Sequence, residues 1–402
     1  MSSGALLGSK ALLRSLHTAV LQTCPLLHKN VPVAQLGKTA AMHSANAPKL
    51  DEYEAQTLQG YEVPAPMGSR FCLQTRHAAI NVQHSTALQT AVMAARLDAS
   101  EGSLWHLAQL QGGGRPEVWV TEHKSNQPGS TLRAVVPDKW VSLELSSQGQ
   151  GIEVSRITEA DVTCFSNGGS VSLGTIKTKK TLIDTRGPAN DGELTAGELS
   201  ASELLLLSGK SPISVRKILG LQLMVSTHAA PVAIKAVYGE DLHVNTCGGS
   251  LSISNISCTK NVHLASGGGN ITVDSLDSGA TIHSEGGAVQ VHLQENVGKI
   301  DIVSGAGNVE IAVTPQTRVR VAVQGASQVI CTDAEVHHGK DAAVLEIDPT
   351  TSGSPTRGTN TKLPPGMSVG TVDVHTHGGK VTVRRAGWKE MVQQRLRLKE
   401  LS

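Results

Sequence analysis

Aromatic residues are scarce in this chain: 4 Trp, 3 Tyr and 2 Phe make up 2% of its 402 residues. Between Ser166 and Arg385 the only aromatic residue is Tyr238. A core without rings must be filled by Val, Ile and Leu, which favours thin, regularly layered β-structure over a globular enzyme core.

Three further absences exclude classes of protein. The charges nearly cancel, with 35 Lys plus Arg against 34 Asp plus Glu, so nothing draws the chain as a whole to nucleic acid. No apolar run approaches the roughly 18 residues of a membrane-spanning helix, so we predict no transmembrane segment. The six cysteines are too scattered for a disulfide framework: Cys24, Cys72, Cys164, Cys247, Cys258 and Cys331.

Residues 1–50 are basic and contain no acidic residue. The stretch from Ala5 to Leu21 can form a helix with leucines on one side and Lys10, Arg14 and His17 toward the other. A basic, acid-free amphipathic helix is typical of an organellar transit peptide. We therefore predict a disordered leader over residues 1–50 and a mitochondrial location, with a plain disordered tail and a secretory signal as the alternatives.

Residues 51–116 give no regular pattern, so we expect a poorly defined N-terminal segment or linker. Thr86 to Leu97 can form a short helix, and the glycines at 112–114 before Pro116 indicate a linker. We expect the structured part to begin at Glu117, with Trp119 and Trp140 closing its N-terminal end.

From Cys164 onward a unit of about twenty residues repeats, with a glycine turn followed by two alternating strands. Successive first strands are offset by 23, 19, 19, 19, 20, 18 and 20 residues, beginning at Val171, Leu194, Ile213, Val232, Leu251, Ile271, Val289 and Val309. The second strand keeps the same period, from Leu221/Leu223 and Leu242/Val244 to Ile300/Ile302. Because one coil buries too little to fold alone, the coils must stack, with rungs about 4.8 Å apart.

The predicted fold is all-β: a single-stranded β-solenoid of about eight coils of 19–20 residues with capping segments. Its repeat core covers residues 164–313, and the whole solenoid domain covers 117–385. Near the C-terminal end we expect strands at 343–347, 370–374 and 380–383, with a loop excursion over 349–367. Residues 386–402 predict a short basic helix, which either caps the stack or binds an acidic lipid or partner.

The coil of glycine turn and alternating strands resembles the adhesin-type class of β-solenoid domains. The acid-poor leader, the coils and the ending from Gly370 to Trp388 resemble its animal member family, family with sequence similarity 185. The resemblance implies a fold and supplies no catalytic residue to carry over.

The second strand of the repeat carries residues that could bind a metal or take part in catalysis. His243, His263, Thr281 and Asp301 occupy equivalent outward positions on consecutive coils, which predicts that the two imidazoles lie one rung apart. His375 and His377 form a second locus on one strand face, near the pair His337-His338. Since a zinc site needs three or four ligands, we assign no catalytic, cofactor or metal site, and name only His243, His263, His375 and His377 as candidate ligands.

The outward face of the first strand is neutral and made of small residues, Ser172, Thr195, Ser214, Ala233, Ser252, Thr272, Gln290 and Glu310. Its single carboxylate does not meet the need of a glycosidase for two facing carboxylates. Two sequons, at Asn255 and Asn270, lie inside the repeat and are expected to be chance matches.

We therefore expect a non-enzymatic solenoid scaffold or binding module without a cofactor. Its unknown protein or polymer ligand would lie along the flat face that carries Ser214, Ser252 and Thr272, or at an end cap. The alternatives are an enzyme acting on a polysaccharide or similar polymer, using His243, His263 and Asp301, and a secreted or cell-surface adhesion protein.

Overall fold

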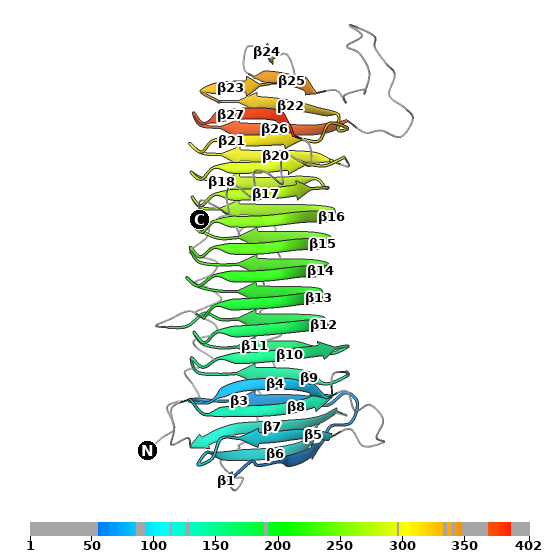
Figure 1. The fold of residues 1–402 in the computed structure, drawn as a ribbon, viewed down its shortest axis with the longest axis vertical. Coiled ribbons are helices and arrows are strands. Elements are labelled where there is room, and N and C mark those ends of the chain that lie inside the picture. The colour runs from blue at the N-terminus through cyan, green and yellow to red at the C-terminus, as the bar shows by residue number, and fades with distance from the viewer. Residues whose placement is uncertain are drawn as a thin grey trace. The chain divides into compact units, whose positions relative to one another are not determined.

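The structure is a computed structural model that describes residues 55–85, 94–112, 115–124, 129–137, 139–188, 192–295, 297–332, 336–339, 342–347 and 369–386. These residues form 27 β-strands and no helix (Figure 1). The predicted leader over 1–50, the loop excursion over 349–367 and the C-terminal helix after Ala386 lie outside the described residues.

The centre of the fold is a stack of coils whose strands pair in parallel. Five long strands form the middle of the stack: β12 (Val171–Asp184), β13 (Leu194–Leu207), β14 (Ile213–Ser226), β15 (Val232–Asn245) and β16 (Leu251–Ser266). In the next coils the long strand divides into two, giving β17 (Ile271–Leu276), β18 (Ala280–Ser284), β19 (Val289–Leu293), β20 (Lys299–Ser304) and β21 (Val309–Val313). The fold is the predicted β-solenoid.

The register agrees with the repeat found in the sequence. Val171 pairs with Leu194, and the chain of pairs continues through Ile213, Val232, Leu251, Ile271, Val289 and Val309. Every one of these residues is at most 1% exposed. The aliphatic periodicity therefore set the pairing, because a slip of one residue would turn each apolar side chain to solvent.

One residue that we predicted to point inward, Leu221, does not. We expected Leu221 and Leu223 to point inward, but Leu223 pairs with Leu242 and Val225 with Val244. Leu221 is 48% exposed, whereas Leu223 is 1% exposed. The inward pair of β14 therefore lies two residues further along the chain, at Leu223 and Val225.

In eight coils a buried hydroxyl closes the turn that begins the coil. In each case the side-chain hydroxyl donates to the backbone carbonyl three residues later, at Ser147, Ser166, Ser208, Thr227, Thr246, Ser266, Ser284 and Ser304. All eight residues are at most 2% exposed. Each buried hydroxyl thus has a hydrogen-bond partner within its own turn.

The N-terminal end of the stack begins well before Glu117, contrary to our expectation. Its strands are β1 (Ala55–Gln56), β2 (Tyr61–Pro64), β3 (Arg70–Gln74), β4 (Ala79–Ser85), β5 (Ala94–Ala99), β6 (Leu104–Gly112), β7 (Arg115–Lys124), β8 (Thr131–Pro137), β9 (Ser142–Ser146), β10 (Ile152–Thr158) and β11 (Val162–Phe165). The expected helix at Thr86–Leu97 is also wrong where it is described, since Ala94–Ala99 is a strand. The described ends of the expected linker belong to the antiparallel strands β6 and β7, since Gly112 pairs with Arg115 and Gln111 with Pro116.

The order of strands in space differs from their order in the chain at this end. β3 lies between β7 and β9, and β4 lies between β8 and β10, all in parallel pairs. Outside them, β6 and β5 pair antiparallel with β7 and β8, and β1 and β2 pair antiparallel with β6 and β5. These antiparallel strands cover the edges that a solenoid otherwise leaves open. They therefore close this end of the stack, a role that we had expected of the segment around Trp119 and Trp140.

The C-terminal end repeats this arrangement. It contains β22 (Val319–Gln324), β23 (Gln328–Cys331), β24 (Val336–His338), β25 (Ala343–Ile347), β26 (Gly370–Thr376) and β27 (Lys380–Arg385). The last two strands of the chain lie between earlier ones, β26 between β20 and β22, and β27 between β21 and β23 (Figure 1). β25 then pairs antiparallel with β22, and β24 with β25.

Candidate functional site

The histidines on the second strand lie together as predicted. His243 on β15 pairs with His263 on β16, and their rings stack with centroids 4.7 Å apart at an interplanar angle of 13°. The same column continues through Thr281 to Asp301. The parallel register therefore brings two imidazoles into direct contact on the outer surface.

The surroundings of His243 favour its neutral ring. Burial lowers the pKa of His243 below its ordinary value, the neighbouring His263 lowers it further, and Asp241 opposes the shift. Asp301 forms an ion pair with Lys299 at 3.0 Å, so its carboxylate has a partner away from the histidines. Within the described ranges no group of three His, Cys, Asp or Glu residues is arranged to hold a metal ion.

The second histidine locus is dispersed over the surface. His375 and His377 are both exposed on or just after β26, and His375 pairs with Val303 and Gln324, neither of which ligates metals. His337 on β24 is exposed as well. The structure thus brings His243 and His263 together but assembles no larger cluster around His375 and His377 among the residues it describes.

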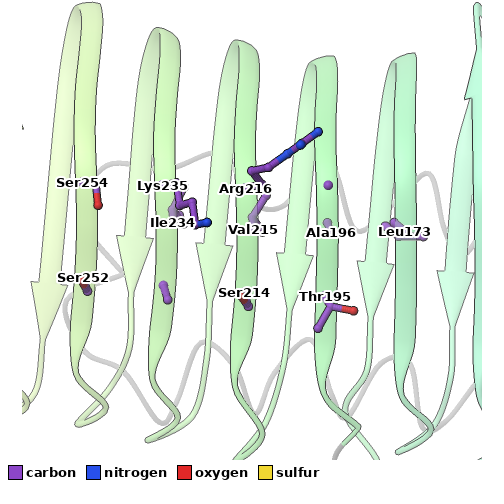
Figure 2. Close-up of a pocket in the computed structure, with 12 residues that line it drawn as sticks. Leu173, Thr195, Ala196, Ser214, Val215, Arg216, Ile234, Lys235, Ser252 and Ser254 are labelled. Carbon is purple, nitrogen blue, oxygen red and sulfur yellow. The ribbon is translucent and has the colours of Figure 1, made fainter. Parts of the chain in front are cut away.

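A shallow hollow of about 380 Å³ lies on the outward face of the first strand. We call it the strand-face groove. Two columns of residues across β13 to β16 line it, Thr195, Ser214, Ala233 and Ser252 in one, and Gly197, Arg216, Lys235 and Ser254 in the other (Figure 2). Its volume falls at the lower end of the range for small-molecule sites, about 300–1,000 Å³.

The first column is the floor of the groove. Thr195, Ser214, Ala233 and Ser252 are paired in register across four strands, so their side chains form a straight row (Figure 2). Three of the four carry hydroxyl groups, and none is larger than threonine. The floor is therefore flat and able both to donate and to accept hydrogen bonds.

The second column forms a charged rim. Arg216 and Lys235 are exposed and lie on adjacent coils, and Figure 2 shows the Arg216 side chain extending toward the strand that carries Ala196. Among the described residues neither cation forms an ion pair, whereas the nearby Lys177 and Glu198 pair with each other at 3.5 Å. The rim thus presents two positive charges that are available to a ligand.

Backbone packing keeps one end of the rim open. A Cβ atom at Gly197 would lie 2.7 Å from the carbonyl oxygen of Gly174, and one at Gly174 would lie 1.9 Å from that of Ser155. Side chains are excluded at both positions, so nothing stands beside Arg216 on the neighbouring coil. The groove follows from the change at this repeat position from two glycines to the two long side chains of Arg216 and Lys235.

The sequence predicted part of this site. The row that contains Ser214 and Ser252, which we expected as one possible ligand face, lines the groove, whereas Thr272 lies outside it. The prediction missed Arg216 and Lys235, whose common repeat position, 19 residues apart, was the signal available to find them.

The remaining candidate residues have structural partners. The Asn255 side chain donates to the Tyr238 hydroxyl at 3.1 Å, and Asn270 Oδ1 accepts from the Ala288 backbone N–H at 2.9 Å. Burial raises the pKa of the Cys258 thiol to about 11 and that of Cys164 to about 12, so both stay protonated at neutral pH.

The fold is therefore a β-solenoid that carries the strand-face groove on its outer surface. The chain belongs to the Toastrack DUF4097 family, whose match covers residues 118–384. No curated protein matches the chain. In the part of the chain that the structure describes, no helix has the length and apolar character needed to cross a membrane.

Two solved structures are similar to most of the chain. One is a "putative cell adhesion protein" from Clostridium sporogenes, with 10% identity, 83% of this chain and 98% of that chain covered, and a TM-score of 0.17. The other is a "putative adhesin" from Bacteroides fragilis, with 10% identity, 82% and 98% covered, and a TM-score of 0.20.

These comparisons correct one prediction. The mitochondrial location is contradicted by the assignment of the chain to the Toastrack DUF4097 family. The prediction depended on residues 1–50, which lie outside the family match. Their basic, acid-free composition reflects only charge and amphipathicity, and these properties do not distinguish one destination from another.

Proposed function

We propose that this protein is a non-enzymatic adhesion module that binds its ligand along the strand-face groove, at a cell surface or outside the cell. The single observation that carries the proposal is the groove itself: a flat hydroxyl-bearing floor beside two exposed cations. A regular stack of coils holds this surface rigid, because each floor residue lies on a strand paired on both sides.

The lining of the groove favours binding over catalysis. It contains no Asp, Glu, His or Cys. A glycosidase needs two facing carboxylates, and nucleophilic catalysis needs a nucleophile within reach of a base. The other residues of the lining are small, apolar or cationic, and none is a carboxylate or imidazole that could act as general base for Ser214 or Ser252.

The second candidate function is an enzyme that acts on a polymer. The stacked rings of His243 and His263 are the observation that favours it. Loss of turnover on a polysaccharide in His243→Ala, with an unchanged melting temperature, would be required to establish it. Within the adhesin-like class, the resemblance to the animal family with sequence similarity 185 stays a prediction from the sequence.

A bulky side chain in the groove floor tests the proposal. The full chain is labelled, and its binding to fixed bacterial cells and to fixed animal cells is measured by flow cytometry. Ser214→Trp fills the floor on β14, and Ser226→Trp places the same side chain at the C-terminal end of the same strand, outside the groove lining, as the matched control. We expect saturable binding of the wild type to at least one cell type, lost in Ser214→Trp and kept in Ser226→Trp. Equal binding by both variants, or no binding by the wild type, would refute the groove as an adhesion site.

A further inference from the structure

The charge of the groove is one-sided. Arg216 and Lys235 stand at the rim, and no carboxylate lies in the lining. Their positions are equivalent on adjacent coils, so the two backbones are about 4.8 Å apart. A neutral ligand would leave both cations without a partner, whereas a ligand with repeated negative groups would pair with them.

The floor of the groove narrows the chemical class of the ligand further. Thr195, Ser214 and Ser252 offer hydroxyl groups in a row, which suit a ligand rich in hydroxyl groups of its own. The lining contains no aromatic ring, so it has no platform on which nucleobases could stack. Nucleic acid therefore fits the floor poorly, although its phosphates would suit the rim.

An acidic peptide also fits poorly. Extended peptides usually bind a sheet by pairing with an edge strand. The strands beneath the groove, β13 to β16, are hydrogen-bonded on both sides to neighbouring coils, so none offers a free edge. A peptide in the groove could therefore contact only side chains and could not pair with the backbone of a strand.

We infer that the strand-face groove binds an acidic polysaccharide, with its carboxylates at Arg216 and Lys235 and its hydroxyls on the row from Thr195 to Ser252. This inference rests on the proposed function and names the chemical class of its ligand. The polysaccharide lies across the coils, because both columns run from one coil to the next.

The experiment compares two forms of one polymer. Polygalacturonate and its fully methyl-esterified form share a backbone and differ in charge. The binding of each to the full-length protein is measured by isothermal titration calorimetry. The variant Arg216→Gln/Lys235→Gln removes both rim charges, and Lys179→Gln/Arg320→Gln removes two exposed cations outside the groove as the matched control. Circular dichroism verifies the fold, and the single variants R216Q and K235Q replace the double variant if it does not fold.

We expect the wild type to bind polygalacturonate and to bind the ester at least about tenfold more weakly. R216Q/K235Q should lose about tenfold in affinity for polygalacturonate, and the control less than about twofold. Equal affinity for acid and ester, or an unchanged affinity in R216Q/K235Q, would overturn the inference.

Two further results separate this inference from the proposed function. If neither form of the polymer binds but Ser214→Trp still abolishes cell binding, the groove is the site and the ligand class is wrong. Tighter binding of oligothymidylate or polyglutamate that depends on Arg216 and Lys235 would likewise replace the polysaccharide by nucleic acid or peptide. If Ser214→Trp leaves cell binding intact, the proposed function fails and this inference with it.

Discussion

Substitution of a single turn glycine tests how closely the coils are packed. Gly287 lies in the turn between β18 and β19, and a Cβ atom there would lie 2.1 Å from the carbonyl oxygen of Gly269 and 2.7 Å from that of Gly268. Its neighbour Gly286 has no atom within 4 Å of the same position. Gly287→Ala should therefore disturb the stack, while Gly286→Ala should not.

The magnitude follows from the contacts that must move. Relief of the clash requires the turn to shift by about 1 Å. That shift disturbs three hydrogen bonds, Ser284 Oγ to the Gly287 carbonyl at 2.9 Å, Ala288 N to Asn270 Oδ1 at 2.9 Å, and Ile271 N to the Ala288 carbonyl at 2.9 Å. At about 1 kcal/mol for each bond and about 1–3 kcal/mol for overpacking, Gly287→Ala should cost about 4–6 kcal/mol.

Urea unfolding of the full chain, followed by far-UV circular dichroism, measures this loss. Because stacked repeats need not unfold in one step, hydrogen exchange of the Ile271 and Val289 amides gives a local measurement beside the global one. We expect Gly286→Ala to change the unfolding free energy by less than about 1 kcal/mol. Equal stability of the two variants would refute the close backbone approach between coils.

Three more predictions follow from individual side chains. Leu223→Ala should cost about 2–5 kcal/mol of unfolding free energy and Leu221→Ala less than about 0.5, since only Leu223 is buried; similar values would contradict the register. Glu122→Ala should cost about 3–5 kcal/mol in a thermal or urea unfolding assay, because one buried carboxylate oxygen accepts the backbone N–H groups of residues 76–78; a near-neutral effect would contradict this role. The pKa of His243 is lowered from its ordinary value of 6.5, so between the two values the unfolded chain binds more protons than the folded one. Stability should therefore fall as the pH drops through this window, and His243→Gln should flatten the pH dependence of the unfolding free energy; an unchanged slope would exclude His243 as its source.

Local repetition made the centre of the fold predictable. The period from Val171 to Val309 fixed both the inward residues and their partners, because neighbouring coils are joined by short turns. The contact between His243 and His263 followed from the same period. Where the alternation is interrupted, as between the exposed Leu221 and the buried Leu223, the sequence pattern no longer shows which pair points inward.

The ends were not predictable in the same way. Arg70 pairs with Ser142, and Lys299 with Thr371, across about seventy residues of chain. No local period links such partners, since the strands between them lie elsewhere in the stack. The N-terminal strands also contain Phe71, Trp105 and Trp119 in their core and lack the aliphatic repeat by which we recognised the coils.

The sequence by itself determined the all-β class, the length of the coil and the row of small residues on its outward face. These properties depend on alternation and on spacing along the chain. In a strand, alternation decides which face of the sheet a residue lies on, and the repeat spacing decides which coil it belongs to. Only the tertiary structure decided that β3 and β4 lie between later strands of the chain and that β26 and β27 lie between earlier ones. It also decided that Arg216 and Lys235 lie together beside the positions of Gly174 and Gly197, where side chains are excluded. Both depend on which distant backbones come into contact, and close packing between coils, not the local pattern, fixes that choice.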